Sequence, residues 1–445
     1  MRTKPNAAPP ARTAPVHIVT LGCSKNQVDS EVLLAQLQGS GLQAAHRDAP
    51  AEGGIVVINT CGFIDRAKEE SVNTILEYVD RKEQGLVDKV VVTGCLSARY
   101  KDDLMAEIPE VDAWFGNHLD LPQLAAYLGA DYRHELVGER RNTQEGHFAY
   151  LKIAEGCNRP CSFCAIPLMR GKHQSRSIEF LVEEARHLVS RGVRELMLIA
   201  QDLTYYGIDL YGKRRLADLL HALADIEGLR WIRLHYAYPS GFPLEILPVI
   251  RERDNICSYL DIPLQHISDH MLKTMRRGIS RSRTEELVAR IREEVPGIAL
   301  RTTLLIGHPG ERPEDHAELL EFIAAARFDR LGVFTYSHEE NTYAGDRMAD
   351  EVPEAVKMAR RNEVMELQQE ISLELNRARI GQELTVVVDR EEAGFWVGRT
   401  EYDSYEVDNE VILHSAQPLR VGAFYHARIT DAMEYDLVGE VLRAE

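Results

Sequence analysis

Short apolar runs alternate with helix-like patterns over the first third of the chain. The apolar runs are residues 16–23, 54–61 and 89–95. They are rich in valine and isoleucine, which is the composition of strands buried on both faces. Between them, apolar residues recur at helical spacing over 30–41 and 66–85, and both segments end at a glycine. This alternation predicts a doubly wound α/β domain over residues 15–135.

The same alternation continues on a larger scale from residue 143 to residue 378. The six predicted strands lie within 148–156, 195–202, 231–239, 258–266, 299–310 and 330–340. Helical segments separate them, and a long helical stretch follows the last. Six βα units in series predict a partial (βα)6 barrel of the TIM type.

Residues 381–445 have a different pattern, with five short strand signals and almost no helical signal. A segment of this size and pattern predicts a small antiparallel β-barrel. The chain therefore contains three predicted domains, preceded by residues 1–14. Those residues contain charge and proline but no apolar segment, so we expect a disordered tail and no secretory signal.

Composition limits the classes of function. The 445 residues carry a formal net charge of −18 and seven cysteines. No window reaches the ~18 apolar residues of a membrane span, so we expect a cytoplasmic protein. Its cysteines should stay reduced, which favours metal ligation or catalysis over disulfides. The negative charge argues against a protein that coats nucleic acid.

Three cysteines, Cys157, Cys161 and Cys164, directly follow the first strand of the predicted barrel. That position is the C-terminal mouth, where barrel enzymes carry their chemistry. A four-iron cluster normally takes four thiolates, so three leave one iron open to a bidentate ligand such as the amine and carboxylate of S-adenosylmethionine. The spacing C-x3-C-x2-C matches the radical S-adenosylmethionine superfamily, in which the protein orients and shields the cofactor's radical chemistry. The alternative is a structural zinc site with His173 as fourth ligand.

Cys23, Cys61 and Cys95 each end one of the three N-terminal apolar runs. Ligands of open α/β sheets bind beyond the carboxyl ends of the strands, so three parallel strands would bring these thiolates to one rim. This placement predicts a second cluster with an open iron. The alternative is three buried cysteines that pack as small apolar side chains, and for Cys257 that interpretation is preferred.

Four motifs together resemble the methylthiotransferases: LGCSKNQVDSE, INTCGFI, TGCL and EGCNRPCSFCAIPLMRGKHQSRS. The resemblance covers the chain after the tail, and it implies an N-terminal cluster domain, a radical S-adenosylmethionine barrel and a C-terminal TRAM module. It also implies that Cys157, Cys161 and Cys164 hold the radical-generating cluster. Cys23, Cys61 and Cys95 would hold an auxiliary cluster that delivers sulfur. One S-adenosylmethionine would supply a methyl group and a second the radical, with a flavodoxin or ferredoxin as electron donor.

The family has two branches that differ in substrate. One modifies an adenosine in transfer RNA, and the other modifies the β-carbon of an aspartate in ribosomal protein uS12. The stretches LGCSKNQVDSE, PLQHISD and GRTEYDSYEVDNEV are closer to the ribosomal branch. One departure is His308, at a position where an aromatic or apolar residue is more usual; we expect it to leave cluster binding unaffected. A third hypothesis is an electron carrier without its own chemistry, but two incomplete cysteine sets argue against a carrier.

Polar residues at the strand ends are further candidates. Gln201, Asp202, Gln265 and His266 should face the mouth and contact S-adenosylmethionine or substrate, or else satisfy loop backbone groups. A basic run follows the cysteine loop and consists of Arg170, Lys172 and Arg176. It is either a solvated loop or the charge complement of a substrate or cofactor carboxylate.

The C-terminal module is strongly acidic. Residues 381–445 hold fourteen Asp and Glu against five Arg, a net charge of −9. Such a surface should repel RNA and attract a basic ribosomal protein, so we expect no strong general nucleic-acid binding. The expected docking residues are Glu401, Asp403, Glu406, Asp408 and Glu410. The alternative is an acidic face that only aids solubility.

Overall fold

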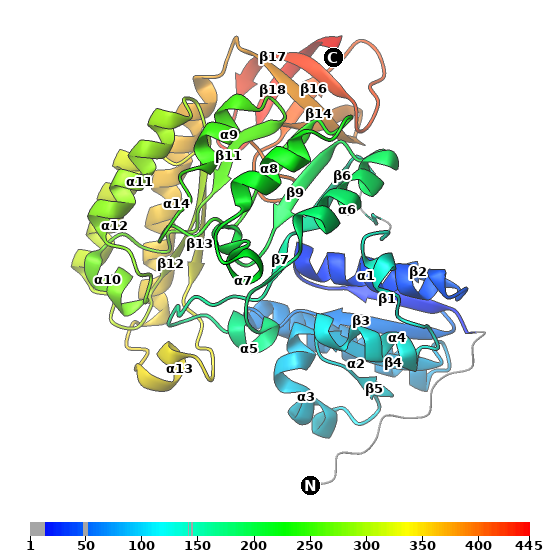
Figure 1. The fold of residues 1–445 in the computed structure, drawn as a ribbon. Helices are drawn as coiled ribbons and strands as arrows, with labels where there is room; N and C mark the ends of the chain where they lie inside the picture. The colour runs from blue at the N-terminus through cyan, green and yellow to red at the C-terminus, as the bar shows by residue number, and fades with distance from the viewer. Residues whose placement is uncertain (1–13, 48–51, 141, 144–145) are drawn as a thin grey trace.

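The structure is a computed structural model that describes residues 14–47, 52–140, 142, 143 and 146–445. The predicted tail, except Ala14, lies outside the described residues. Three β-structures follow one another along the chain (Figure 1). The central sheet lies between an N-terminal α/β domain and a C-terminal β-barrel.

Among the described residues, five parallel strands form the N-terminal sheet in the order β2-β1-β3-β4-β5. The strands are β1 Val16–Thr20, β2 Ala44–His46, β3 Ile55–Thr60, β4 Lys89–Gly94 and β5 Ala113–Trp114. Helices cover both faces: α1 Ser24–Gly39, α2 Asp65–Glu83, α3 Cys95–Glu107 and α4 Leu121–Tyr127. In β3, Ile55 and Val57 join one apolar core while Val56 and Ile58 join the other, which explains the unbroken apolar run. The doubly wound prediction is confirmed; β2 and β5 were missed because each is so short.

Helix α1 begins at Ser24, six residues earlier than its apolar pattern predicts. Its polar first turns are buried, including Lys25, Asn26 and Asp29. These residues are buried because α1 lies between its own sheet and the central barrel. Ile199 of the barrel packs into the same apolar core as the apolar side chains of α1.

Within the described residues, six parallel strands form the central sheet in chain order. They are β6 Phe148–Lys152, β9 Glu195–Ile199, β10 Trp231–Leu234, β11 Ile256–Asp261, β12 Ala299–Ile306 and β13 Arg330–Thr335. The longer helices around them are α6 Ile178–Ser190, α8 Leu216–Ala224, α9 Ile246–Glu252, α11 Arg281–Glu294, α12 Pro313–Ala326 and α14 Glu354–Arg377. The sheet does not close, so the predicted partial barrel is confirmed.

Short elements occupy the loops. They are η1 His118–Asp120, η2 His134–Val137, β7 Ala154–Glu155, α5 Ile166–Arg170, β8 Gln174–Ser175, η3 Leu203–Tyr205, α7 Ile208–Tyr211, α10 Asp269–Thr274 and α13 Tyr343–Arg347. The pair β7 and β8 forms a two-stranded antiparallel sheet on either side of the cysteine loop.

Residues 381–445, all of them described, form a closed five-stranded barrel. Its strands are β14 Glu383–Glu392, β15 Phe395–Thr400, β16 Val411–His414, β17 Phe424–Ala432 and β18 Leu437–Ala444. The pairings are antiparallel except β16 with β18, which is parallel and differs from the prediction. The module packs on the amino ends of the central strands, where Cys257 is buried among Trp231, Tyr259 and Val387. Cys257 is therefore a core residue, as predicted.

In the described part of the chain, none of the helices combines the length and apolar character that a membrane span requires.

Candidate functional site

The cysteine loop of the barrel is held by its backbone. Gly156 has φ +77°, and a Cβ there would lie 2.2 Å from the carbonyl oxygen of Lys172, so this position accepts only glycine. Ser162, between the second and third cysteine, donates its N–H to the Met275 carbonyl at 3.1 Å. The loop is therefore attached both to β8 and to the segment after α10.

The three thiols of this loop lie among hydrogen-bond donors. Arg277 Nη1 donates to Cys161 Sγ at 3.2 Å, and the Tyr238 hydroxyl is 3.6 Å from the same sulfur. The N–H of Arg159 donates to Cys157 Sγ at 3.4 Å. Such donors suit thiolates that ligate a cluster, where they tune its potential.

Burial raises the pKa of Cys157 to about 11 and that of Cys164 to about 12. A bound metal would supply the positive charge that these thiolates need. Among the described residues, no three His, Cys, Asp or Glu side chains converge tightly enough for a single ion. His173 instead contacts Ser175 Oγ at 3.1 Å and the Tyr205 ring. His173 therefore contacts other groups in the described structure, which argues against it as the fourth ligand of a zinc site.

The N-terminal cysteines all follow strand ends. Cys23 precedes α1, Cys61 follows β3 directly, and Cys95 is the first residue of α3 after β4. A Cβ at Gly22 would lie 2.7 Å from Cys61 Sγ, so the first and second loops touch. Cys95 Sγ lies 3.7 Å from Asn26 Oδ1, so the third loop reaches the first turn of α1. Cys61 and Cys95 are buried but Cys23 is exposed, which contradicts the alternative of three core cysteines.

The two cysteine sets meet where α5 packs on α3. Helix α5 directly follows Cys164, and its residue Met169 shares an apolar cluster with Cys95. The last residue of α5, Arg170, donates from Nε to Cys95 Sγ at 3.1 Å. A side chain of the segment that follows Cys164 thus touches the N-terminal cysteine set.

A buried network of charges fills the space beside this contact. Arg170 Nη1 donates to Asp29 Oδ2 at 2.6 Å and to Glu155 Oε2 at 3.2 Å. Lys152 donates to Asp29 and, at 2.6 Å, to Glu155. Burial alone would raise the pKa of both carboxyls, but the two cations hold each pKa below its usual range. The network is therefore two cations balanced by two anions.

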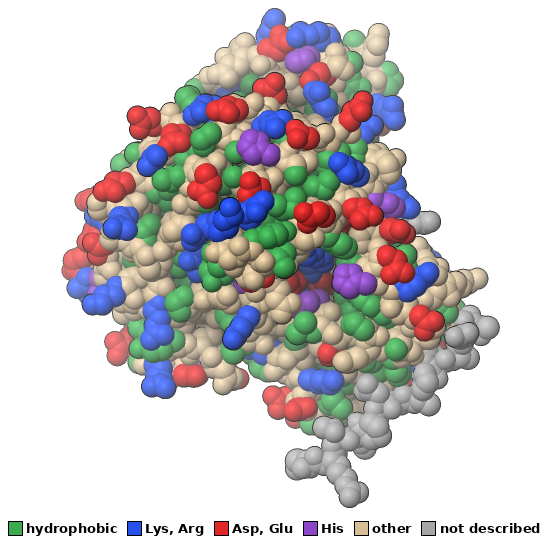
Figure 2. Space-filling view, viewed as in Figure 1, with side chains coloured by type: hydrophobic (Ala, Val, Ile, Leu, Met, Phe, Trp, Pro, Cys, Tyr) green, Lys and Arg blue, Asp and Glu red, His purple; other side chains and the backbone are tan. Residues whose placement is uncertain are grey.

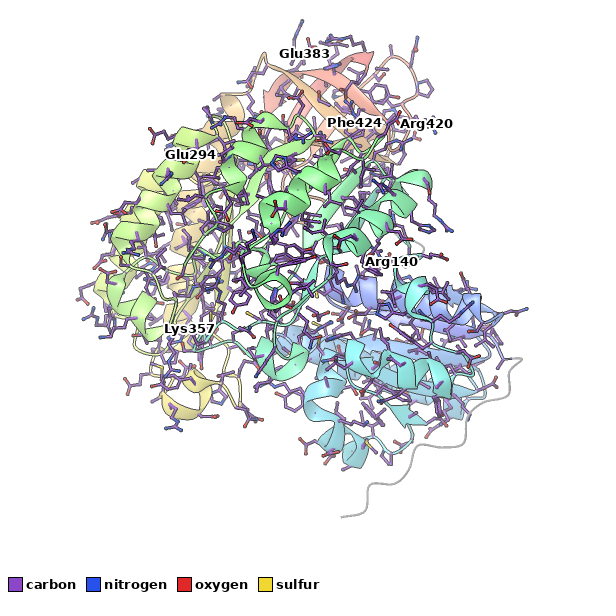
Figure 3. The ribbon with its side chains drawn as sticks, viewed as in Figure 1. Arg140, Glu294, Lys357, Glu383, Arg420 and Phe424 are labelled. Atoms are coloured by element: carbon purple, nitrogen blue, oxygen red, sulfur yellow. The ribbon has the colours of Figure 1, made fainter. Side chains whose placement is uncertain are left out.

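A second buried network joins the domains through Arg140, which Figure 3 labels at the junction of the N-terminal domain and the barrel. Its Nε donates to Glu184 at 2.6 Å, its Nη1 donates to Glu31 of α1, and its Nη2 donates to the Tyr150 carbonyl. These contacts fix α1 against α6 and β6.

The rest of the predicted basic run lies outside the site. Lys172 is exposed. Arg176 pairs with Glu184 at 3.2 Å. Only Arg170 contacts the cysteine region, and it is paired with protein carboxylates.

The four predicted mouth residues differ in their surroundings. Gln201 Nε2 donates to Glu155 Oε1 at 2.6 Å, while its own Oε1 is buried and finds no partner among the described residues. Asp202 accepts from Arg159 Nε at 2.7 Å and caps η3 through Thr204. Gln265 has φ +73° and bridges to Leu304 at the carboxyl end of the sheet.

For His266, contact with S-adenosylmethionine or substrate stays a prediction, since its Nε2 is buried without a partner among the described residues. His266 is fully buried, and its Nδ1 accepts from the N–H groups of Ile267 and Ser268. Burial lowers its pKa to about 3, so it remains neutral. It supports the turn that leads into α10.

His308, the departure noted in the sequence, contacts the cysteine loop; whether it affects cluster binding stays a prediction. Its Nδ1 donates to the Pro309 carbonyl, so Nε2 accepts from the Ser162 hydroxyl at 3.0 Å. Its ring lies edge-on to Phe163. A side chain that looked like a neutral departure therefore supports the cysteine loop.

Family models match three segments of the chain. Residues 15–116 match Uncharacterized protein family UPF0004, residues 151–323 match the Radical SAM superfamily, and residues 380–442 match the TRAM domain. The ribosomal protein uS12 methylthiotransferase RimO of Cytophaga hutchinsonii is 57% identical over 429 residues, covering 96% of this chain and 98% of that protein. The Flavobacterium johnsoniae protein of the same name is 58% identical over 427 residues, covering 96% and 97%. The chain belongs to the uS12 methylthiotransferase family.

Solved structures agree on the fold alone. The radical S-adenosylmethionine methyltransferase TsrM from Kitasatospora setae aligns with a TM-score of 0.57 at 17% identity, covering 75% of this chain and 77% of that one. The cobalamin-dependent radical enzyme OxsB aligns with a TM-score of 0.53 at 13% identity, covering 75% and 54%. Both likenesses support the α/β fold over about three quarters of this chain.

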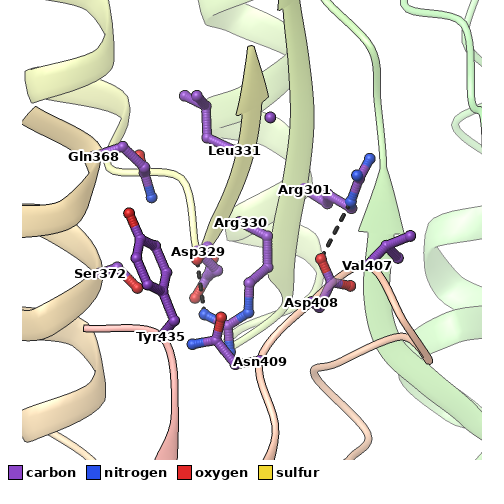
Figure 4. Close-up of a pocket in the computed structure, with 11 residues that line it drawn as sticks. Arg301, Asp329, Arg330, Leu331, Gln368, Ser372, Val407, Asp408, Asn409 and Tyr435 are labelled. Atoms are coloured by element: carbon purple, nitrogen blue, oxygen red, sulfur yellow. Dashed lines mark hydrogen bonds and ion pairs between the residues drawn. The ribbon is translucent and has the colours of Figure 1, made fainter. Parts of the chain in front are cut away.

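The acidic segment of the TRAM module was predicted to be an exposed docking surface. Two of its five acids are instead buried in ion pairs with the barrel. Asp403 is buried and accepts from Arg330 Nε at 2.8 Å, and Asp408 accepts from Arg301 Nε at 3.2 Å beside a cavity of about 220 Å³ (Figure 4). These two residues hold the module to the barrel, which corrects their predicted docking role. Figure 2 shows Lys and Arg side chains beside Asp and Glu over the module. Two of its acids that are partly exposed form ion pairs, Glu410 with Arg390 and Glu383 with Arg443.

The remaining three acids vary in availability. Glu406 is exposed. Glu410 pairs with Arg390 at 2.6 Å, and Glu401 Oε2 accepts from the Ser258 N–H at 3.1 Å. Their docking role stays a prediction.

Sequence reasoning missed the buried charges near the cysteines, namely Lys25, Asp29, Lys152 and Glu155. One signal was present. The segment from Ser24 to Glu31 is polar at every position except Val28, although it follows a buried strand. A polar helix start beside a cysteine is typical of a site.

Proposed function

We propose that this protein is a radical S-adenosylmethionine methylthiotransferase that modifies the β-carbon of an aspartate in ribosomal protein uS12. The observation that carries the proposal is the meeting of two three-cysteine sets across the α3–α5 contact. Identity above 50% to uS12 methylthiotransferases over 96% of the chain directs it to that substrate. The branch that acts on transfer RNA is not favoured.

Two four-iron clusters would be held, one by each cysteine set. The residues are Cys157, Cys161 and Cys164 for the radical cluster, and Cys23, Cys61 and Cys95 for the auxiliary cluster. The first would supply the electron that cleaves S-adenosylmethionine, and the second would supply sulfur, with one further S-adenosylmethionine as methyl donor.

Other residues of the chain hold the cysteine loop in place and stabilise its ligands. Ser162 and Gly156 fix the radical loop, and Arg277 and Tyr238 stabilise negative charge on Cys161 Sγ. Gln201, whose Oε1 has no partner within the described structure, offers an acceptor to S-adenosylmethionine or substrate. Asp202 fixes Arg159 beside Cys157, and Gln265 lies at the same end of the sheet.

The partners follow from this assignment. The basic protein uS12, free or in the small subunit, is the substrate, and Glu401, Glu406 and Glu410 contribute to its docking by charge attraction. A flavodoxin or ferredoxin in the cytoplasm is the electron donor, and strong general binding of nucleic acid is not part of the proposal. The proposed domains are residues 15–135, 143–378 and 381–445.

Mass spectrometry of uS12 and transfer RNA from a deletion strain tests this proposal. uS12 should lack a methylthio group that the wild-type gene restores, while transfer RNA modification should be unchanged. Loss of a methylthio group from transfer RNA, with uS12 intact, would replace this proposal by its alternative.

A further inference from the structure

Lys25 is a buried cation at the seam between the two cysteine sets. It lies in the first turn of α1, two residues after Cys23, and only 8% of its surface is exposed. Its Nζ lies 3.2 Å above the centre of the Tyr236 ring, which belongs to the loop after β10. Tyr236 has φ +63°, a conformation that non-glycine residues adopt at some energetic cost, often at functional sites. The side chain therefore reaches from the auxiliary set to the barrel mouth.

In the described part of the chain, no carboxylate forms an ion pair with this ammonium. Among the residues that the structure describes, no hydrogen bond or ion pair involves Lys25 Nζ. The nearby acids Asp29 and Glu155 are already balanced by Lys152 and Arg170. Neither of these acids is therefore left to neutralise Lys25.

The start of α1 adds to this positive potential. Cys23 occupies the cap position and makes no side-chain hydrogen bond to the first turn of this 16-residue helix. Unpaired N–H groups at a helix start carry partial positive charge and favour an anion. A buried, unpaired ammonium is costly, and the Tyr236 ring offsets only part of that cost. The arrangement suits a bound carboxylate.

We propose that Lys25 binds the side-chain carboxylate of the substrate aspartate and thereby selects aspartate and positions its β-carbon. This inference rests on the proposed function. In that reaction the β-carbon receives sulfur from the auxiliary set, and the carboxylate is bonded directly to that carbon. The group that holds the carboxylate must therefore lie close to the sulfur donor, and Lys25 follows Cys23 by two residues at the start of α1. S-adenosylmethionine also carries a carboxylate that Lys25 could bind. That carboxylate is expected instead at the open iron of the cluster held by Cys157, Cys161 and Cys164.

The test measures the affinity of the reconstituted full-length protein for two substrates. These are uS12 and a uS12 variant whose target aspartate is replaced by asparagine. The wild-type protein should prefer the aspartate form by roughly ten- to a hundredfold, the range of a charge-assisted hydrogen bond. Lys25→Met should bind both forms within about threefold of each other, and Lys25→Arg should restore part of the preference.

Lys101→Met, in α3 of the same domain, is the matched control and should keep the wild-type preference. Iron content and substrate-independent cleavage of S-adenosylmethionine should be unchanged in Lys101→Met, and the same two quantities are measured in Lys25→Met. Retained aspartate preference in Lys25→Met overturns the inference, as does weaker binding of S-adenosylmethionine without a change in preference. If wild-type protein neither binds nor modifies uS12, the proposed function itself fails.

Discussion

Replacing Asp403 by asparagine should loosen the C-terminal barrel from the radical barrel. Asp403 and Arg330 are both almost fully buried, with Arg330 Nε 2.8 Å from Asp403 Oδ1. The other carboxylate oxygen accepts from Thr400 Oγ1 at 2.6 Å. Breaking a buried pair leaves one charge uncompensated and costs about 3–5 kcal/mol. Since about 1.4 kcal/mol corresponds to a factor of ten, the module should open roughly a hundred to several thousand times more often.

Hydrogen exchange measures this opening directly in the strands of the module. Amide protection in β14, β15 and β17 should fall by that factor in Asp403→Asn. Arg330→Met combined with Asp403→Leu should recover most of it, because no charge is then left unpaired. Glu410→Gln is the matched control, since its pair with Arg390 is about one-third exposed and is worth at most about 1 kcal/mol. Unchanged protection in Asp403→Asn, together with weaker binding of uS12, would refute the structural role and restore the docking role.

Other parts of the chain give three further predictions. Alanine at Cys157, Cys161 and Cys164 should abolish cleavage of S-adenosylmethionine and remove about half the iron. Alanine at Cys23, Cys61 and Cys95 should preserve cleavage and abolish methylthiolation. Loss of all iron in either variant would contradict the independence of the two cluster sites. His308→Ala removes the hydrogen bond to Ser162, which should weaken the attachment of the cysteine loop by about 1–3 kcal/mol and lower both iron retention and cleavage. His308→Phe should be less affected because its ring fills the space. Unchanged iron loading in His308→Ala would show that this hydrogen bond is dispensable. Glu406→Lys combined with Glu410→Lys should weaken uS12 binding severalfold at low salt and leave both clusters intact, and a salt-independent affinity equal to wild type would remove these residues from the docking surface.

Much of the fold was predictable because each main strand is a separate apolar run. The runs before Cys23, Cys61 and Cys95 became β1, β3 and β4, and their shared direction placed the cysteines at one rim. The parallel pairing of β16 with β18 was not predictable, since the local pattern does not encode which strands become neighbours.

The candidate site was only partly predictable, for a related reason. Net charge says nothing about pairing, and the partners of Asp403 and Asp408 lie 73 and 107 residues away in sequence. Lys25 was missed because helical periodicity marks only where apolar residues recur, and the first turns of α1 are polar. A buried polar turn is recognised only when both surfaces that cover it are known.

The central claim is that two cysteine sets act together to place a methylthio group on uS12. The most direct measurement is fragmentation mass spectrometry of uS12 after reaction with the anaerobically reconstituted protein, a reductant and S-adenosylmethionine carrying an isotopically labelled methyl group. The account predicts one labelled methylthio group on the β-carbon of a single aspartate, and none with the Cys23, Cys61 and Cys95 variant. Unmodified uS12 after turnover by a fully iron-loaded protein, or a labelled methylthio group on transfer RNA offered in the same reaction, would contradict it.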